Sequence, residues 1–141
     1  MQRMFFSVVL LVCMHLLPAS TFAADSLYVR LGGKPVITQV VEQTIGSVAR
    51  DPKVNQSFDK VNLKRLNEKL VEQICSITDG GCTYTGDDMK RVHQGLKISG
   101  REFNALVEAL RKALDARGVD EREKNELLSI LAPMKRLVVE Q

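Results

Sequence analysis

Residues 84–98 read Tyr-Thr-Gly-Asp-Asp-Met-Lys-Arg-Val-His-Gln-Gly-Leu-Lys-Ile and contain His93, one of two histidines in the 141-residue chain. Met89, Val92 and Leu96 recur at helical spacing, which predicts a helix that turns His93 toward an apolar interior. A buried imidazole needs a hydrogen-bond partner, a charge or a metal, because an unpaired polar group there costs about 1–3 kcal/mol. From this context alone, a histidine satisfied by a carbonyl and a metal-binding histidine both stay open.

Helical spacing of apolar residues continues on both sides of this stretch, and no segment alternates as a strand would. It predicts helices over residues 35–49 and 62–78, and a longer helix opened by a capping box at Ser99–Glu102 and ended before Gly118. A last helix from about Asp120 either tolerates Pro133 or kinks there. Gly80-Gly81 ends the second of these helices. We therefore expect one all-α domain.

The first 23 residues resemble a secretion signal. Arg3 gives a positive start, an apolar run too short to span a bilayer follows, and small residues up to Ala24 offer a cleavage region. We expect cleavage after Ala23 or Ala24, leaving residues 24–141 as the mature domain, periplasmic or secreted and without a stable membrane span. An uncleaved anchor is the alternative. Lipidation at Cys13 is disfavoured because its neighbours form no lipobox.

The charge of the mature domain argues against a nucleic-acid partner. Arg3 is the one basic residue of the signal, so 19 of the 20 basic residues remain beside 17 acidic ones, a net charge of +2. Nucleic-acid binding calls for a basic face, and base stacking calls for more aromatic side chains than this domain has. We also expect a monomer.

Several short motifs together point to a known family. They are Leu31-Gly-Gly33, Asp51-Pro52 before Phe58, Gly80-Gly81, and the run Tyr84-x-Gly86-x-x-Met89-Lys90-x-x-His93-x-Gly95. In this combination the chain resembles the group I truncated haemoglobins, short globins in which a two-over-two helical sandwich surrounds haem. The resemblance extends from about Leu27 to Val139, and the histidine run is its most specific part.

The resemblance implies site residues by position. His93 matches the proximal histidine that binds haem iron, and a neutral imidazole nitrogen suits that role. Phe58 matches an aromatic side chain packed on the porphyrin, although an ordinary core aromatic is the alternative. Met89 belongs to the same motif as His93 and is a further candidate for haem contact. No Cys-x-x-Cys-His is present, so we expect haem b held non-covalently.

The helix over residues 62–78 matches the distal wall of the haem pocket. Leu66, Lys69 and Leu70 correspond to haem-facing positions, and Lys69 is expected at the haem edge near a propionate, a solvated surface lysine being the alternative. A neutral lysine amine also binds iron, which makes Lys69 a hypothetical sixth ligand. A high-spin ferric spectrum that is unchanged in Lys69→Ala would remove that hypothesis.

The chain departs from the family at the positions that usually donate a hydrogen bond to the gas ligand. Thr44 and Ile45 stand where a Phe-Tyr pair is usual, and Leu70 stands where many members have glutamine. Such a bond is worth about 1–3 kcal/mol, so its loss predicts faster oxygen release and faster autoxidation. Gln73 or Thr44 substitutes for the lost donor if the alignment is shifted by one residue.

Cys75 and Cys82 remain after the signal is removed. In an exported protein such a pair favours a disulfide over two free thiols. Closing so short a loop stabilises the fold by about 2–3 kcal/mol on the chain-entropy estimate. The bridge would join the end of the distal helix to the segment entering the histidine helix.

The leading interpretation is a globin that reversibly binds oxygen or another diatomic gas and is reduced by an unknown donor. An enzyme with nitric-oxide dioxygenase or peroxidase-like activity is the alternative, and it would need a polar distal group and an electron source. The apolar distal positions disfavour it. A helical domain without haem, in which His93 is merely satisfied, is the third interpretation.

Overall fold

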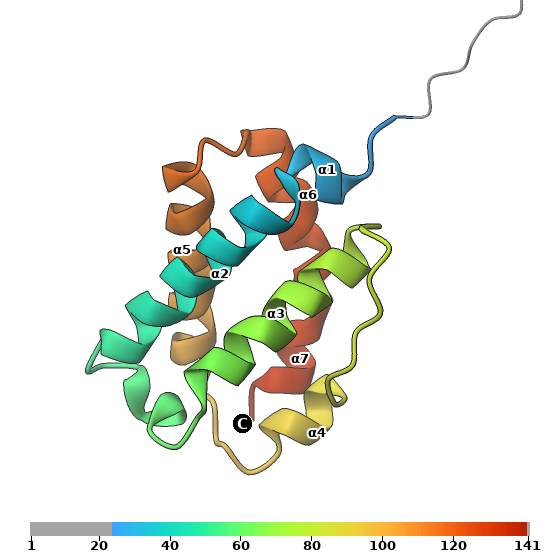
Figure 1. Cartoon of the computed structure of the whole chain (residues 1–141). Coiled ribbons are helices and arrows are strands. Elements are labelled where there is room, and N and C mark those ends of the chain that lie inside the picture. Colours follow the sequence, from blue (N-terminus) through green and yellow to red (C-terminus); the bar gives the residue numbers. More distant parts are fainter. Residues whose placement is uncertain (1–23, 141) are drawn as a thin grey trace, which may run out of the picture.

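The fold consists of two layers of helices. The computed structural model describes residues 24–140, and all regular structure in that range is helical. The elements are α1 (Leu27–Arg30), α2 (Gly33–Arg50), the 3-10 turn η1 (Asn55–Phe58), α3 (Leu63–Ile77), α4 (Met89–His93), α5 (Gly100–Ala116), α6 (Glu121–Leu131), the 3-10 turn η2 (Ala132–Met134) and α7 (Lys135–Val138). Helices α2 and α3 form one layer, and α5 and α6 form the other (Figure 1). The prediction of an all-α fold is confirmed.

The predicted signal peptide lies outside the described residues. Within residues 24–140, none of the helices combines the length and the apolar character that crossing a membrane requires.

The core lies where α2 packs against α5 and α3. Ile37, Val41 and Ile45 recur along α2 at helical spacing and are buried, as are Leu110 and Leu114 of α5. The helix begins two residues earlier than the sequence predicted, because Pro35 fits the first turn, where its missing N–H costs no hydrogen bond. Burial of this stripe from water is what holds the two layers together.

The end of α3 is a close-packed corner. The helix stops at Thr78, and Asp79 takes the left-handed conformation at a φ of 59° just before Gly80. A Cβ atom on Gly80 would lie 2.6 Å from Cys75 Sγ and 2.7 Å from the Tyr28 ring, so only glycine fits there. The turn that ends this helix is thus made at Asp79, one residue before the predicted glycine pair, and Gly80 is needed for the close approach.

Helix α4 is shorter than the sequence suggested. Asp88 caps it by accepting hydrogen bonds from the N–H groups of Lys90 and Arg91, and it ends at His93. Leu96 therefore lies beyond the helix, and the expected apolar stripe is wrong: Val92 is 41% and Leu96 45% exposed. The prediction from apolar periodicity assumed a helix of at least two turns. Gly95, at a φ of 82°, redirects the chain before a second helical turn forms.

Helix α5 begins and ends where predicted, whereas the last predicted helix begins as expected but ends at Leu131 as α6. Ser99 and Glu102 form the capping box at the start of α5, each side chain bonding the other residue's backbone N–H. The last helical segment breaks at Pro133, which sits in η2 between α6 and α7. This break lets α7 turn and pack against α4.

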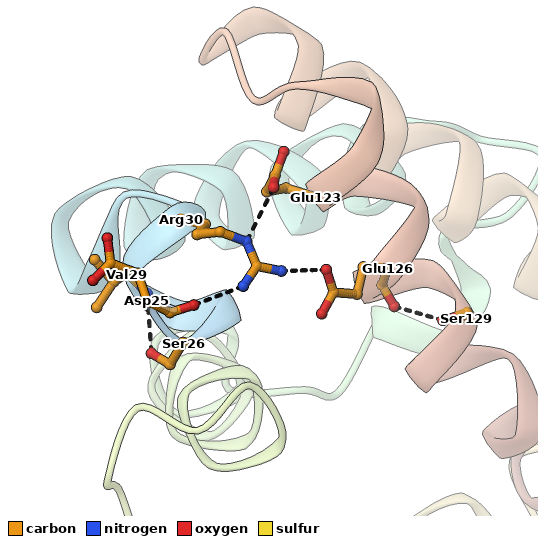
Figure 2. Close-up of polar contacts among 7 residues, drawn as sticks. All are labelled: Asp25, Ser26, Val29, Arg30, Glu123, Glu126 and Ser129. Carbon is orange, nitrogen blue, oxygen red and sulfur yellow. Dashed lines mark hydrogen bonds and ion pairs between the residues drawn. The ribbon is translucent and has the colours of Figure 1, made fainter. Parts of the chain in front are cut away.

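Helix α1 is fastened to α6 by one arginine. Arg30 Nε donates to Glu123 at 3.0 Å, its second nitrogen pairs with Glu126, and its third donates to the Asp25 carbonyl at 2.7 Å (Figure 2). The hydrogen bond from Arg30 lowers the pKa of the Glu123 carboxyl, which is buried. The short first helix, which could not be stable alone, is thereby held in place.

Candidate functional site

A cavity of about 570 Å³ lies between the two layers, within the range of ordinary cofactor sites. Its walls come from seven elements, α2 to α7 and η2, and are mostly apolar. The lining includes Val41, Thr44 and Ile45 of α2, Leu70, Gln73 and Ile74 of α3, Met89 and His93 of α4, Phe103, Leu106, Val107, Leu110 and Arg111 of α5, Asn125, Leu128, Ser129 and Leu131 of α6, and Met134, Lys135 and Val138 of the last segments.

His93 is half-buried and lines this cavity. Its Nδ1 lies 2.7 Å from the carbonyl oxygen of Met89, one turn earlier in α4. A carbonyl only accepts hydrogen bonds, so Nδ1 carries the proton and donates it to that bond. The lone pair then resides on Nε2, which leaves this nitrogen able to bind a metal.

The structure brings three of the six predicted site residues together at the cavity. His93, Met89 and Leu70 all line it. Phe58 and Leu66 are partly buried and pack against the hydrophobic core, and they are not among the lining residues.

Lys69 points to the loop between α3 and α4. Its Nζ lies 2.9 Å from a Glu72 carboxylate oxygen and 2.5 Å from the Thr85 hydroxyl. The hydrogen bonds from Lys69 first, and then from Thr85, lower the pKa of Glu72 to about 2. We call this set of residues the loop latch: Lys69, Glu72 and Thr85. The loop latch fastens the loop to α3. Binding of iron by Lys69 would therefore require the ion pair between Lys69 and Glu72 to break.

Gln73 places a polar group in the apolar cavity. It is only 8% exposed, and its amide Nε2 lies 3.4 Å from Met89 Sδ and 3.7 Å from Met134 Sδ. Thioether sulfur is a weak acceptor, so this amide keeps the capacity to donate to a ligand. The hydroxyl of Thr44 is used differently, because it donates to the Val40 carbonyl at 2.7 Å.

The sequence reasoning missed the lining residues from α5, α6 and the C-terminal segments. Periodicity marked Leu106 and Leu110 as inward, which is true of any core residue and does not separate a cavity wall from solid packing. The polar lining residues Arg111, Asn125 and Ser129 carried no signal at all, since each also suits a solvated helix face.

Two links besides the loop latch hold the segment that carries His93. Cys75 and Cys82 form a disulfide, as predicted, with 5.7 Å between their Cα atoms. On the other side of α4, Glu140 accepts hydrogen bonds from the backbone N–H of Gly95 at 2.5 Å and of Lys97 at 2.9 Å, and its own N–H donates to the Ile98 carbonyl at 3.0 Å. The chain is thus fixed both before and after His93.

Comparisons with known proteins agree with this arrangement. The family model of the bacterial-like globins matches residues 26–140. A group 1 truncated hemoglobin of Mycolicibacterium paratuberculosis is 36% identical over 109 residues, which cover 77% of this chain and 80% of that protein. Another from Nostoc sp. is 28% identical over 115 residues, covering 82% of this chain and 98% of the relative.

Solved structures show the same fold. The Fe(III) form of truncated hemoglobin from Tetrahymena pyriformis matches with a TM-score of 0.78 at 20% identity, covering 83% of this chain and 100% of that one. The 2/2 hemoglobin from Synechococcus sp., in the cyanomet state and with covalently attached heme, matches with a TM-score of 0.77 at 24% identity over the same shares of the two chains. The chain belongs to the bacterial-like globins, and within them to the group 1 truncated haemoglobins.

Proposed function

We propose that this globin binds haem b through His93 and reversibly binds a diatomic gas, oxygen first among them. The observation that carries the proposal is the hydrogen bond from His93 Nδ1 to the Met89 carbonyl, which leaves Nε2 free at a cavity with mostly apolar walls. Such a nitrogen is a suitable axial ligand, and apolar walls bury the porphyrin. When bound, the haem iron supplies the site at which a gas binds.

The residues around the cavity fit such a group. His93 supplies the metal ligand, and Leu70, Ile74 and Leu110 supply apolar contact. Haem also carries two carboxylates, which require cations or water. Arg111 and Lys135 line the cavity, and Lys69 stays a candidate at the haem edge as the family resemblance implies. Phe58 and Leu66 pack against the core and do not line the cavity, so we propose no direct haem contact for them.

The test is the absorption spectrum of the purified protein supplied with haemin, in ferric, ferrous and carbon monoxide forms. We expect a Soret band that His93→Ala weakens or shifts strongly. Thr44→Val, which changes another lining residue and leaves the ligand nitrogen in place, should keep the band. A protein that stays colourless, or one whose spectrum His93→Ala leaves unchanged, would overturn the proposal. In the ferric form, the Lys69→Ala spectrum also tests lysine as a sixth ligand.

Non-covalent attachment is part of the proposal and has its own test. The chain contains no Cys-x-x-Cys-His, and its two mature cysteines are bonded to each other. Acidified organic solvent should therefore extract all of the haem. Haem that stays with the protein after this treatment would show a covalent link, like the covalently attached heme of the 2/2 hemoglobin from Synechococcus sp..

Gln73 favours a second candidate, an enzyme that consumes nitric oxide. The sequence disfavoured this activity because the distal positions are apolar, whereas the Gln73 amide supplies a polar group inside the cavity. Consumption of nitric oxide in aerobic solution, measured with an electrode and lost in Gln73→Leu, would support the enzyme. Unchanged consumption in that variant would show that Gln73 is not needed for it, and a wild-type protein that does not consume nitric oxide repeatedly would leave gas binding as the function.

We also propose export to the periplasm or beyond. The reason lies in the sequence of residues 1–23, together with a disulfide, which persists in oxidising compartments. Cell fractionation of the full chain tests this proposal, and recovery of the uncleaved protein in the cytoplasm would contradict it.

A further inference from the structure

Exposed apolar side chains gather beside His93. Val92, Leu96 and Leu137 are 41%, 45% and 39% exposed, and all three belong to α4, the segment after it, or α7. Helices α4 and α7 pack against each other at one end of the molecule (Figure 1). Residues 89–101 and 132–140 are called the His93 face below.

The His93 face is strongly basic, while the other residues that the structure describes are acidic on balance. It has six basic residues and one acidic residue, Glu140, for a net charge of +5. The basic residues are Lys90, Arg91, Lys97, Arg101, Lys135 and Arg136, and all are exposed. The remaining described residues, 24–88 and 102–131, have 13 basic and 16 acidic residues, a net charge of −3.

Little within the described residues neutralises this charge. The carboxylate of Glu140 is bonded to the backbone N–H groups of Gly95 and Lys97. Arg91 pairs with Asp87 at 3.8 Å, but both side chains are well exposed, so this pair is weak. Asp88 and Glu102 lie next to the face, and each is used in capping a helix. Exposed apolar side chains and six exposed basic residues are thus left together on the His93 face.

We propose that the His93 face is the docking surface for an acidic protein that delivers electrons to the haem. The inference rests on the proposed function, because ferric iron must be reduced before it binds oxygen. One electron passes from the reduced donor to ferric iron, which becomes ferrous, and no bond is made or broken. The interfaces in electron-transfer complexes bury little surface, and complementary charge steers their formation. The His93 face is basic, so it would attract an acidic donor, and it contains the histidine proposed to hold the iron.

The experiment uses reduced plant-type ferredoxin, an acidic iron–sulfur protein, mixed anaerobically with the ferric haem-loaded globin. At low ionic strength, Lys90→Glu/Lys97→Glu should lower the second-order rate of reduction about tenfold or more, and should flatten its dependence on salt. The matched control is Lys34→Glu/Arg122→Glu. It reverses two exposed charges at the starts of α2 and α6, at the other end of the molecule (Figure 1), and should change the rate by less than twofold.

Two further measurements separate docking from other effects. Photoreduced lumiflavin, which is small and uncharged, should reduce both variants at the wild-type rate, and a slower rate would assign the loss to the iron's reduction potential. Amide chemical-shift changes on titration with oxidised ferredoxin should map to α4 and α7. Equal rate losses in both double variants, or shift changes elsewhere, would overturn the proposal. So would binding of the face to vesicles of phosphatidylglycerol but not to ferredoxin, which would assign the charge to a membrane. A failure of the globin to take up haem would appear earlier, in its spectrum.

Discussion

At the scale of single residues, the position of one amide decides how polar the cavity is. The sequence placed only apolar groups at the expected donor positions, and Gln73 was considered only as a substitute. Whether Gln73 faces the cavity depends on the rotation of α3 about its axis, and a shift of one residue turns a helical side chain by about 100°. The identity of the residues along α3 does not fix that rotation. For His93, the specific motif around it was enough to predict that it faces the cavity.

Replacing Gln73 should speed up the release of oxygen. Gln73→Leu keeps the volume and removes an amide that donates only to two sulfur atoms, so it should cost little stability. We expect release about fivefold faster, which corresponds to one hydrogen bond of roughly 1 kcal/mol. Stopped-flow measurement of oxygen dissociation gives the rate. Thr44→Val is the matched control, because that hydroxyl is bonded to a carbonyl; an equal acceleration in both variants would argue against a specific role for Gln73.

The Glu72 carboxyl should stabilise the protein near neutral pH and lose this contribution in acid. Its pKa falls from 4.5 to about 2 in the folded protein, chiefly through the hydrogen bond from Lys69. A carboxyl whose pKa is lower in the folded than in the unfolded protein stabilises the fold at pH values above its unfolded pKa. This contribution disappears as pH falls from about 4.5 to about 2. Glu72→Gln should therefore lower the free energy of unfolding at pH 6 and show a smaller loss over that interval. Urea unfolding at several pH values measures this, with Glu68→Gln, an exposed neighbour, as control; parallel curves for wild type and Glu72→Gln would contradict it.

At the scale of elements, α4 and the loop before it depend on links to other parts of the chain. Five residues cannot form a stable helix alone, so the disulfide, the loop latch and the Glu140 contacts must hold α4 in place. The sequence revealed the disulfide because the cysteines stand close together in the chain. It did not reveal the latch or the Glu140 contacts, since Thr85 and Glu140 are distant in sequence from their partners. Lys69 and Glu140 are also ordinary surface residues.

Removing the disulfide should destabilise the fold. Cys75→Ser/Cys82→Ser is expected to lower the free energy of unfolding by about 2–3 kcal/mol, the chain-entropy estimate for a loop of this length. Chemical unfolding measures the loss. Cys75 is 1% exposed, so Cys75→Ala/Cys82→Ser serves as a second variant that avoids burying a hydroxyl. Two titratable thiols in the oxidised wild-type protein would contradict the pairing itself.

The contacts of Glu140 should protect the segment after His93. Glu140→Gln weakens two charge-assisted hydrogen bonds, so the Gly95 and Lys97 amides should exchange with deuterium about tenfold faster, equivalent to roughly 1.4 kcal/mol. Glu108→Gln, which changes an exposed glutamate paired with Lys112 on α5, should leave these amides unaffected. Hydrogen exchange read by NMR provides the comparison, and equal rates in the three proteins would show that the contacts are not formed in solution.

At the scale of the whole molecule, the sequence was sufficient for the architecture. Apolar periodicity gave the long helices, the Ser99 capping box and Gly118 marked the bounds of α5, and the motif around His93 pointed to the family. The fold follows from burial of these stripes in two layers. The charge difference between the His93 face and the rest could not be read in advance, because the net charge of +2 averages over both. Only folding brings α4 and α7 together and shows the separation.

The way Arg30 joins α1 to α6 has a practical result for anyone handling the protein. That junction lies at the end of the molecule away from the site where Glu140 meets the chain after His93 (Figure 1). A purification tag or fluorescent fusion placed between the proposed signal and residue 24 would start from the Arg30 end, at a distance from the part of the cavity lined by α4 and α7. The same addition after Glu140 would crowd the carboxylate that secures Gly95 and Lys97, so the front of the chain is the better attachment point.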